Sequence, residues 1–168
     1  MNIPIPYRLK DKWGFCNENR EIIITCIYEY AKPFQEGLAP VQLNGLWGAI
    51  SPSGELVIPC IHKKEGSVYP LQFSEGLAII YNKKGKMGFI NKKGKIVIEP
   101  KYSCCGWFFE GLAIIESRGK LGFINKKGEV VIPCKYDVAM PFENGVALVG
   151  NNKSKGFISK TGIEFWDN

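Results

Sequence analysis

Short apolar runs separated by turns recur along the whole chain. In one typical stretch, apolar runs at 77–81, 86–90 and 95–98 are separated by two turns of sequence Asn-Lys-Lys-Gly. Short runs rich in β-branched and aromatic residues, bounded by Asn and Gly, are typical of antiparallel hairpins, because Gly supplies the positive φ that the turn needs. The pattern therefore predicts three antiparallel strands in this stretch.

The same stretch occurs five times. Its most regular position is a glycine inside the second strand, preceded by a bulky residue in most copies. The five pairs are Trp13-Gly14, Trp47-Gly48, Met87-Gly88, Leu121-Gly122 and Lys155-Gly156. Successive glycines are 34 residues apart, except for one interval of 40. A glycine within a strand often marks a place where a neighbouring backbone or ring approaches closely, and we interpret this column as such a notch.

Periods of this length define repeat folds. We predict a single all-β domain over residues 1–168, made of five tandem three-stranded antiparallel β-meander repeats with a period of about 34 residues. The units cover approximately residues 1–33, 34–72, 73–107, 108–141 and 142–168. Either an open superhelical array or a propeller-like ring would bury the same faces, so the pattern leaves both arrangements open.

Two aromatic columns accompany the repeat. The first, which follows the third strand, consists of Tyr28, His62, Tyr102 and Tyr136. The second, which precedes the next apolar run, consists of Phe34, Phe73, Phe108 and Phe142. We expect both columns to fill the space between neighbouring sheets, and we expect prolines such as Pro133 to end the third strand, because proline lacks a backbone donor.

These elements resemble a known family. Lys12-Trp13-Gly14-Phe15, Leu46-Trp47-Gly48-Ala49, the Phe-x-Glu-Gly-Leu-Ala segments and the Ile-Pro-x-x-Tyr linkers are similar to the WG repeats of bacterial proteins. The resemblance covers nearly the entire chain, although Met87, Leu121 and Lys155 take the Trp position in the later units. It implies an all-β scaffold for protein interaction, and it implies no catalytic residues.

Composition adds boundaries to this picture. Apolar residues make up 45% of the 168 residues and the net charge is only +6, so the chain has the composition of a folded domain. The prolines and charges near the N-terminus leave no apolar core for a signal peptide, and no apolar run approaches the length of a membrane span. We therefore expect a cytoplasmic protein that does not contact membranes.

The sequence offers little for catalysis. The one histidine, His62, stands in the Tyr column, and a pair with Cys60 would lack a third group to orient it. Cys26, Cys60 and Cys134 share one repeat position and are interpreted as structural thiols, whereas Cys104-Cys105 has no metal-ligand spacing. The Gly-Lys turns lack the phosphate-loop pattern. We expect no enzyme activity, no cofactor and no metal; a small hydrolase or ligand-binding enzyme on this scaffold, using His62, is the rival hypothesis.

Charge is unevenly distributed along the repeats. Residues 83–135 carry 12 basic and 4 acidic side chains, a balance of +8, whereas the rest of the chain carries 10 and 12. Equivalent turns of successive repeats should fall on one edge, so Lys92-Lys93 and Lys126-Lys127 are expected to form a positive ridge. Such a ridge would attract an acidic partner.

A second candidate surface is an insertion at residues 63–72, since insertions in repeats map to loops that often bind partners. The predicted partner-binding residues on the two surfaces are Lys83, Lys84, Lys92, Lys93, Lys126, Lys127, Tyr69 and Leu71.

The leading functional hypothesis is a non-enzymatic protein-binding repeat scaffold of a bacterium, with a protein partner that is acidic. A narrower version is an immunity-type inhibitor that binds and neutralises a toxin. A further alternative is a nucleic-acid-binding module that uses the basic turns, although exposed aromatic residues do not alternate with those lysines as single-strand binding requires. The sequence leaves the oligomeric state undetermined.

Overall fold

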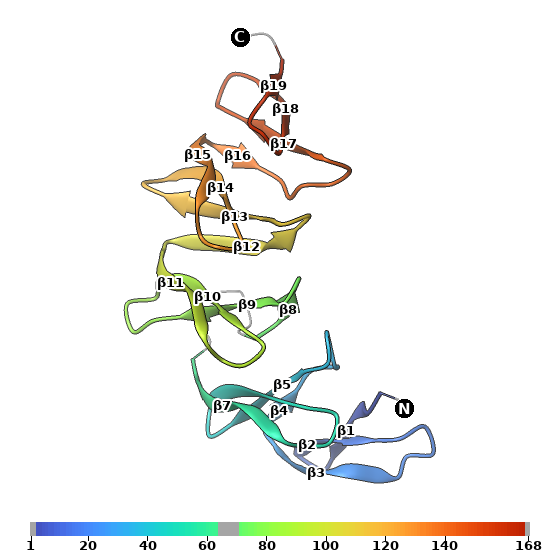
Figure 1. Ribbon diagram of the computed structural model, residues 1–168. Coiled ribbons are helices and arrows are strands. Elements are labelled where there is room, and N and C mark those ends of the chain that lie inside the picture. The colour runs from blue at the N-terminus through green and yellow to red at the C-terminus, as the bar shows by residue number, and fades with distance from the viewer. Residues whose placement is uncertain (1–2, 64–70, 167–168) are drawn as a thin grey trace. The chain divides into compact units, whose positions relative to one another are not determined.

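The computed structural model describes residues 3–63 and 71–166, and these residues form strands and turns without any helix. Because they contain no helix, they also contain no helix that could span a membrane. The strands form five antiparallel sheets that follow one another along the chain (Figure 1). The predicted all-β repeat fold is confirmed.

Each sheet is a meander of consecutive strands. The first sheet consists of β1 (Ile5–Leu9), β2 (Lys12–Cys16) and β3 (Ile22–Tyr28). The second consists of β4 (Tyr30–Ala31), β5 (Ala39–Leu43), β6 (Leu46–Ile50) and β7 (Leu56–His62). The third consists of β8 (Phe73–Ser74), β9 (Leu77–Tyr81), β10 (Met87–Asn91) and β11 (Ile96–Tyr102). The fourth consists of β12 (Cys104–Phe109), β13 (Leu112–Ser117), β14 (Lys120–Asn125) and β15 (Val130–Tyr136). The fifth consists of β16 (Val138–Ala139), β17 (Val146–Gly150), β18 (Lys155–Ser159) and β19 (Glu164–Phe165).

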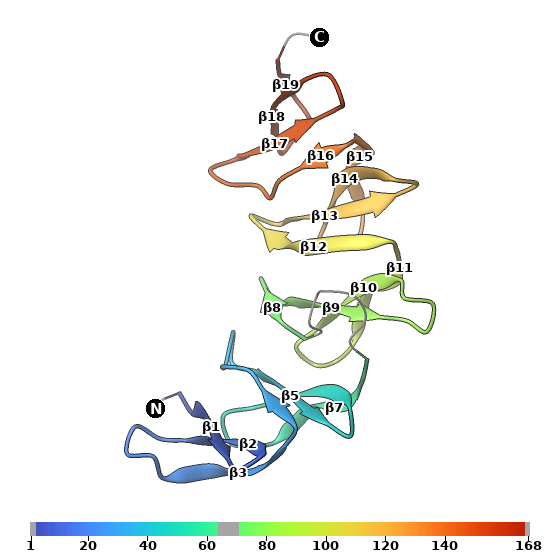
Figure 2. The same cartoon turned by 180° about the vertical axis from the view of Figure 1, so that it is seen from behind.

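The expectation of three strands per unit holds only for the first sheet. The other four sheets have a fourth strand, because the linker after each third strand pairs with the first long strand of the next unit. Tyr30 lies opposite Gln42 and Val138 opposite Gly150, for example. Spatial order equals chain order in every sheet, so the added strand lies at one edge of its sheet. The added strands β8 and β16 can be followed in Figures 1 and 2.

The expectation that proline ends the third strand is wrong. Strand β15 continues through Pro133 to Tyr136, with irregular pairing between Leu121 and Phe123 on the neighbouring strand. A bulge of this kind leaves one residue of the strand unpaired, and a proline is tolerated at a bulge.

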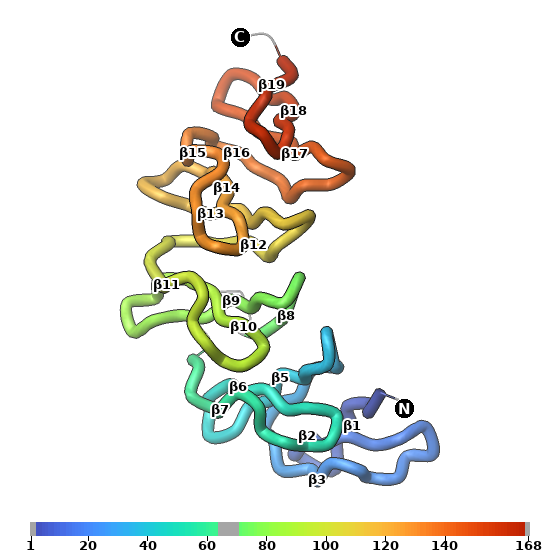
Figure 3. Tube along the Cα trace, in the orientation of Figure 1, coloured from blue at the N-terminus to red at the C-terminus, as the bar shows by residue number. Residues whose placement is uncertain are grey.

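The glycine notch is confirmed. A Cβ atom added at Gly122 would lie 2.5 Å from the carbonyl oxygen of Ile132 and 2.7 Å from the nitrogen of Cys134. Gly14 faces the equivalent backbone atoms at 2.4 Å and 2.7 Å. The bulged third strand therefore approaches the second strand so closely that only glycine fits. The hairpins on either side of this approach can be followed in the chain trace (Figure 3).

The two aromatic columns belong to the core, as predicted. Three of the four Phe residues that precede an apolar run pack against the Phe of the preceding second strand, with ring centroids about 5 Å apart. The pairs are Phe15–Phe34 at 5.0 Å, Phe89–Phe108 at 4.9 Å and Phe123–Phe142 at 4.9 Å. Tyr28, Tyr102 and Tyr136 are buried. Apolar side chains on both faces of each interior sheet therefore join one sheet to the next.

The second sheet departs from this scheme, since Ala49 stands where other sheets have Phe. Leu71, from the end of the insertion, is buried in the same apolar cluster as Ala49 and Phe73, with no exposed surface. Leu71 therefore adds apolar volume to the one interior cluster in which alanine replaces the Phe of the second long strand.

The chain divides into two compact units, residues 1–81 with 90–95 and residues 82–89 with 96–168. The first contains the clusters around Phe15 and Phe73, and the second contains the cluster around Phe123 and Phe142. Every contact used below lies within one unit.

Candidate protein-binding surface

The lysine turns form where they were predicted, and side chains of Asn hold them. Oδ1 of Asn91 accepts hydrogen bonds from the backbone N–H groups of Lys93 and Lys95, at 3.0 Å and 3.1 Å. Asn125 makes the same two contacts with Lys127 and Glu129. Such Asx turns are local, so the Asn-Lys-Lys-Gly sequence is sufficient to project the lysines outward.

Lys92 is paired within the first compact unit, and its predicted partner-binding role stays a prediction. Its Nζ donates to the backbone oxygen of Glu36 at 2.8 Å and lies 3.3 Å from the carboxylate of the same residue. That carboxylate also accepts the N–H of Gly76 at 2.8 Å. Glu36 begins the Glu-Gly-Leu-Ala segment of the second repeat, so these contacts join the second repeat to the third.

The same contact recurs in the second compact unit. The Glu110 carboxylate accepts the N–H of Gly145 at 3.0 Å and pairs with Lys160 at 2.8 Å. The hydrogen bond from Lys160 is the main reason that the pKa of Glu110 lies below its ordinary value. We call this Glu–Gly–Lys contact between successive sheets the clasp. In the sequence, the clasp corresponds to the repeated Glu of the Phe-x-Glu-Gly segments, which net charge alone does not distinguish from other acidic residues.

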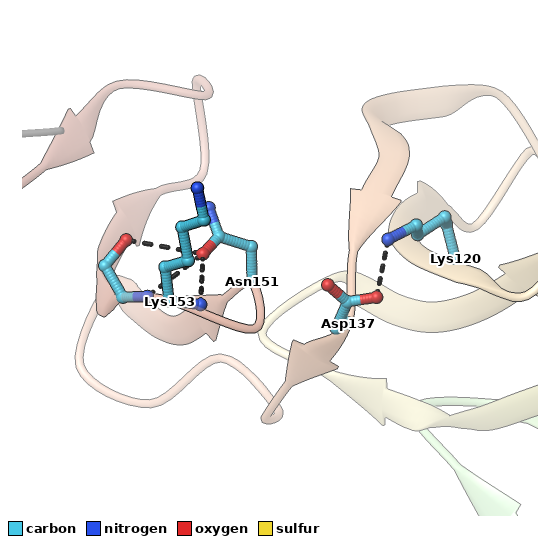
Figure 4. Close-up of polar contacts among 5 residues, drawn as sticks. Lys120, Asp137, Asn151 and Lys153 are labelled. Atoms are coloured by element: carbon cyan, nitrogen blue, oxygen red, sulfur yellow. Dashed lines mark hydrogen bonds and ion pairs between the residues drawn. The ribbon is translucent and has the colours of Figure 1, made fainter.

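Two further lysines of the basic stretch are paired. Lys120 forms an ion pair with Asp137 at 2.5 Å (Figure 4), and Lys135 forms one with Glu164 at 2.7 Å. Lys92, Lys120 and Lys135 of the basic stretch are therefore part of ion pairs within the fold. Figure 4 also shows Asn151 accepting the backbone N–H of Lys153 at 2.8 Å, an Asx turn like those above.

The remaining predicted lysines have exposed side chains: Lys83, Lys84, Lys93, Lys126 and Lys127. Lys92 and Lys93 lie in the first compact unit and Lys126 and Lys127 in the second. The expected side-by-side placement of these two turns stays a prediction.

Of the two partner-binding residues predicted in the insertion, the structure describes only Leu71. Tyr69 lies outside the described residues. Leu71 is fully buried, because it fills the space beside Ala49, so its side chain is not available to a partner.

The most exposed aromatic pair on an edge strand lies on β12. Trp107 is 41% exposed and Phe109 is 40% exposed, whereas Phe108 between them is buried. The strand has an irregular register between Cys105 and Phe108, and the exposed rings lie on either side of the buried Phe108 in the sequence. Strand β12 has six residues, whereas β4, β8 and β16 at the same place in their sheets have two. We call Trp107 and Phe109 the aromatic edge.

The repeats show that the fold does not need this aromatic pair. At the Trp107 position the second and fifth sheets have Pro33 and Pro141, and at the Phe109 position they have Gln35 and Glu143. The aromatic edge does not stand out by residue type, because most aromatic residues of the repeat belong to the core; it stands out only when these columns are compared between repeats.

A basic turn lies beside the start of β12. The Asn82 side chain donates to the carbonyl oxygen of Pro100 at 2.9 Å, and Lys86 Nζ donates to Ser103 Oγ at 3.1 Å. These contacts place the turn that carries the exposed Lys83 and Lys84 against the residues that lead into β12. Aromatic and cationic side chains therefore occur on adjoining elements of one compact unit.

The groups considered for chemistry lie in structural positions. His62 pairs with Trp47 across the strands, as Tyr28 pairs with Trp13, and burial lowers its pKa. Burial raises the pKa of the Cys60 thiol, which weakens it as a nucleophile.

The remaining cysteines also occupy structural positions. All six are free thiols, and those of Cys26 and Cys134 contact the carbonyl oxygens of Tyr7 on β1, at 3.7 Å, and of Ile115 on β13, at 3.9 Å. Within residues 3–63 and 71–166, no three His, Cys, Asp or Glu side chains come together as a metal-binding group.

Comparison with protein families matches these repeats. The family described as "WG containing repeat" matches residues 13–47, 87–120 and 122–153. The chain belongs to the WG-repeat family. The matches include WG-repeat elements in both compact units, and they cover the notch glycines Gly14, Gly88 and Gly122 and the turns that carry Lys92-Lys93 and Lys126-Lys127.

Other comparisons add little. Among solved structures, the crystal structure of the computationally designed Ika4 protein is similar, with 13% identity, 75% of this chain and 87% of that chain covered, and a TM-score of 0.49. The comparison with curated proteins finds no match. The WG-repeat assignment establishes a repeat scaffold, on which the exposed features above are superimposed.

Proposed function

We propose that this WG-repeat chain is a non-enzymatic protein-binding scaffold that holds its partner at the aromatic edge of the fourth sheet. The observation that carries the proposal is the exposure of Trp107 and Phe109 at positions where other repeats of the same chain have proline or polar residues. Residues that the fold does not require, and that expose apolar rings to water, are typical of binding sites.

The chemistry of this surface favours a partner with apolar anchor side chains and acidic flanks. Trp is strongly enriched among residues that dominate binding energy, since its ring combines a large apolar area with a hydrogen-bond donor. Lys83 and Lys84 on the adjoining turn would attract carboxylates and accelerate association, with a dependence on salt. An acidic protein segment with an aromatic or aliphatic residue meets both requirements.

The first experiment identifies the partner. The intact chain is used as bait in a native lysate treated with nuclease, and bound proteins are identified by mass spectrometry and then purified. Binding is measured by calorimetry for the wild type and for Trp107→Pro/Phe109→Gln, which installs the residues of the second sheet. We expect the double variant to lose about 2 kcal/mol or more of binding free energy, a weakening of about 30-fold.

The control is Val130→Thr, which changes an exposed β-branched residue on the opposite edge strand of the same sheet. Circular dichroism and thermal unfolding check that each variant folds, and Phe109→Gln alone serves if the proline disturbs β12. Equal affinity of the wild type and the aromatic-edge variants would overturn the site. Binding that disappears with nuclease treatment would overturn the assignment of a protein partner.

Salt dependence tests the basic turn separately. Lys83→Ser/Lys84→Ser is expected to slow association and to flatten its dependence on salt, while dissociation changes little. An unchanged association rate would show that the partner is not attracted by these lysines.

A further inference from the structure

The fifth sheet exposes a face that is buried in the other WG repeats that have a Phe directly after the notch glycine. Phe157 on β18 is 50% exposed, whereas its counterparts Phe15, Phe89 and Phe123 are at most 1% exposed. Around Phe157 is a groove of about 240 Å³, lined by Met140, Val146, Leu148 and Phe157 among other residues. The repeat register explains why this face is apolar.

The fourth sheet shows what covers such a face. Val146, Leu148 and Phe157 are the repeat equivalents of Leu112, Ile114 and Phe123. Those three residues pack against the fifth sheet. The covering residues on the fifth sheet are Phe142, Ala147, Val149 and Ile158. We call the face that carries Leu112, Ile114 and Phe123 the forward face of its sheet, and the face that carries Phe142, Ala147, Val149 and Ile158 the rear face. A forward face is therefore complementary to a rear face.

The rear face of the first sheet is partly exposed: Ile5 is exposed, whereas Cys16, the equivalent of Ile158, is buried. Ile5 lies opposite Cys16 in the register of β1 and β2, as Ala147 lies opposite Ile158 in the fifth sheet. The equivalents of Ile5 are buried alanines in all four other sheets, Ala39, Ala78, Ala113 and Ala147, whereas Ile5 itself is 46% exposed. An isoleucine at this position supplies apolar volume where the other rear faces have a neighbouring Phe.

We propose that the forward face of the fifth sheet binds the rear face of the first sheet in a second copy of this chain. The junction repeats the contact between the fourth and fifth sheets, with Phe157 in the place of Phe123 and Ile5 in the place of Ala147. Because the two faces differ, the contact is heterologous, and each added copy presents a new forward face. Association therefore continues beyond the dimer unless a ring closes.

The experiment is analytical ultracentrifugation of the full chain over a range of protein concentrations, with two single variants. Phe157→Glu disables the forward face, and Ile5→Glu disables the rear face. The wild type is expected to form dimers and larger species, and each variant alone is expected to be a monomer, with association weakened at least about tenfold. An equimolar mixture should form a dimer and nothing larger, because Ile5→Glu keeps an intact forward face and Phe157→Glu an intact rear face.

Ile163→Glu is the matched control. It changes an exposed apolar residue of the fifth sheet's second turn to the Glu that the first, second and fourth sheets carry at this position, and it should associate like the wild type. A wild type that stays monomeric at all concentrations would overturn the proposal. Dimers formed by Ile5→Glu alone would overturn it in favour of a symmetric contact between two forward faces, and a mixture without dimers would also refute it.

Discussion

Replacing Gly122 by alanine tests whether the glycine of the WG motif is required by backbone contact. The added Cβ would lie 2.5 Å from the Ile132 oxygen and 2.7 Å from the Cys134 nitrogen. Both are backbone atoms, so no side chain can rotate away. The third strand must therefore move outward and weaken its pairing with β14.

The cost follows from two contributions. Overpacking a close-packed site costs roughly 1–3 kcal/mol, and a strained or lost backbone hydrogen bond adds about 1 kcal/mol. Gly122→Ala should therefore destabilise the protein by about 2–4 kcal/mol. At this chain length the melting temperature falls by about 2–4 °C per kcal/mol, so thermal unfolding followed by circular dichroism should show a decrease of about 5–15 °C.

Gly106→Ala is the matched control, because its added Cβ would meet Ile114 Cβ at an ordinary contact distance of 3.5 Å. Here alanine only restricts the unfolded chain, so stability should stay constant or rise by about 0.4–1 kcal/mol. If both variants melted within about 1 °C of the wild type, the explanation of the motif by backbone approach would be wrong.

The remaining predictions concern packing and pH. Leu71→Ala should lower the free energy of unfolding by about 2–4 kcal/mol, because it opens a cavity, and adding Ala49→Phe should restore at least half of that loss. If the effects of the two substitutions on denaturant unfolding were strictly additive, the two side chains would not share the same space. Tyr136→Phe removes a hydrogen bond to Glu164 of 2.5 Å and should cost about 1–2 kcal/mol at pH 7. Burial and Glu164 raise the pKa of Tyr136 above 10.0, so the stabilisation by this hydroxyl is complete below pH 10 and is lost as the pH rises further. A difference in melting temperature between the wild type and Tyr136→Phe that stayed constant at alkaline pH would refute this. Lysine partners lower the pKa values of Glu110 and Glu164 below 4.5, so their stabilisation is present above that pH and is lost as the pH falls through the lowered values. The melting temperature of Glu110→Gln/Glu164→Gln should therefore decrease less steeply in acid than that of the wild type, and parallel curves would contradict the ion pairs.

Most of the strand architecture could be predicted from sequence because its determinants are local. Alternating apolar residues and Asn-Gly turns specify a hairpin within about ten residues, and the period of 34 repeats that specification. The fourth strand was missed because a two-residue strand such as β16 has no periodicity of its own. It exists only because the chain after Tyr136 lies beside β17.

The candidate surfaces were less predictable, because exposure depends on residues far away in the sequence. In the sequence Lys92 does not differ from the other turn lysines, and its partner Glu36 lies 56 residues earlier. Leu71 looks like a loop residue until Ala49 leaves it a space to fill. Conversely, Trp107 resembles the core aromatics in type, and only the neighbouring Phe108 takes the core position.

The sequence by itself determined the all-β repeat, the positions of the notch glycines and the turns, since these depend on contacts within one meander; the close neighbour is backbone at Gly14, Gly88 and Gly122 and the Trp166 side chain at Gly156. Only the tertiary structure decided which charges remain free and which apolar faces remain uncovered. The physical reason is that burial and ion pairing belong to the contact between successive sheets. Phe123 and Phe157 occupy the same position in the repeat, yet the first is buried and the second is half exposed, because only the first is followed by another sheet in the structure.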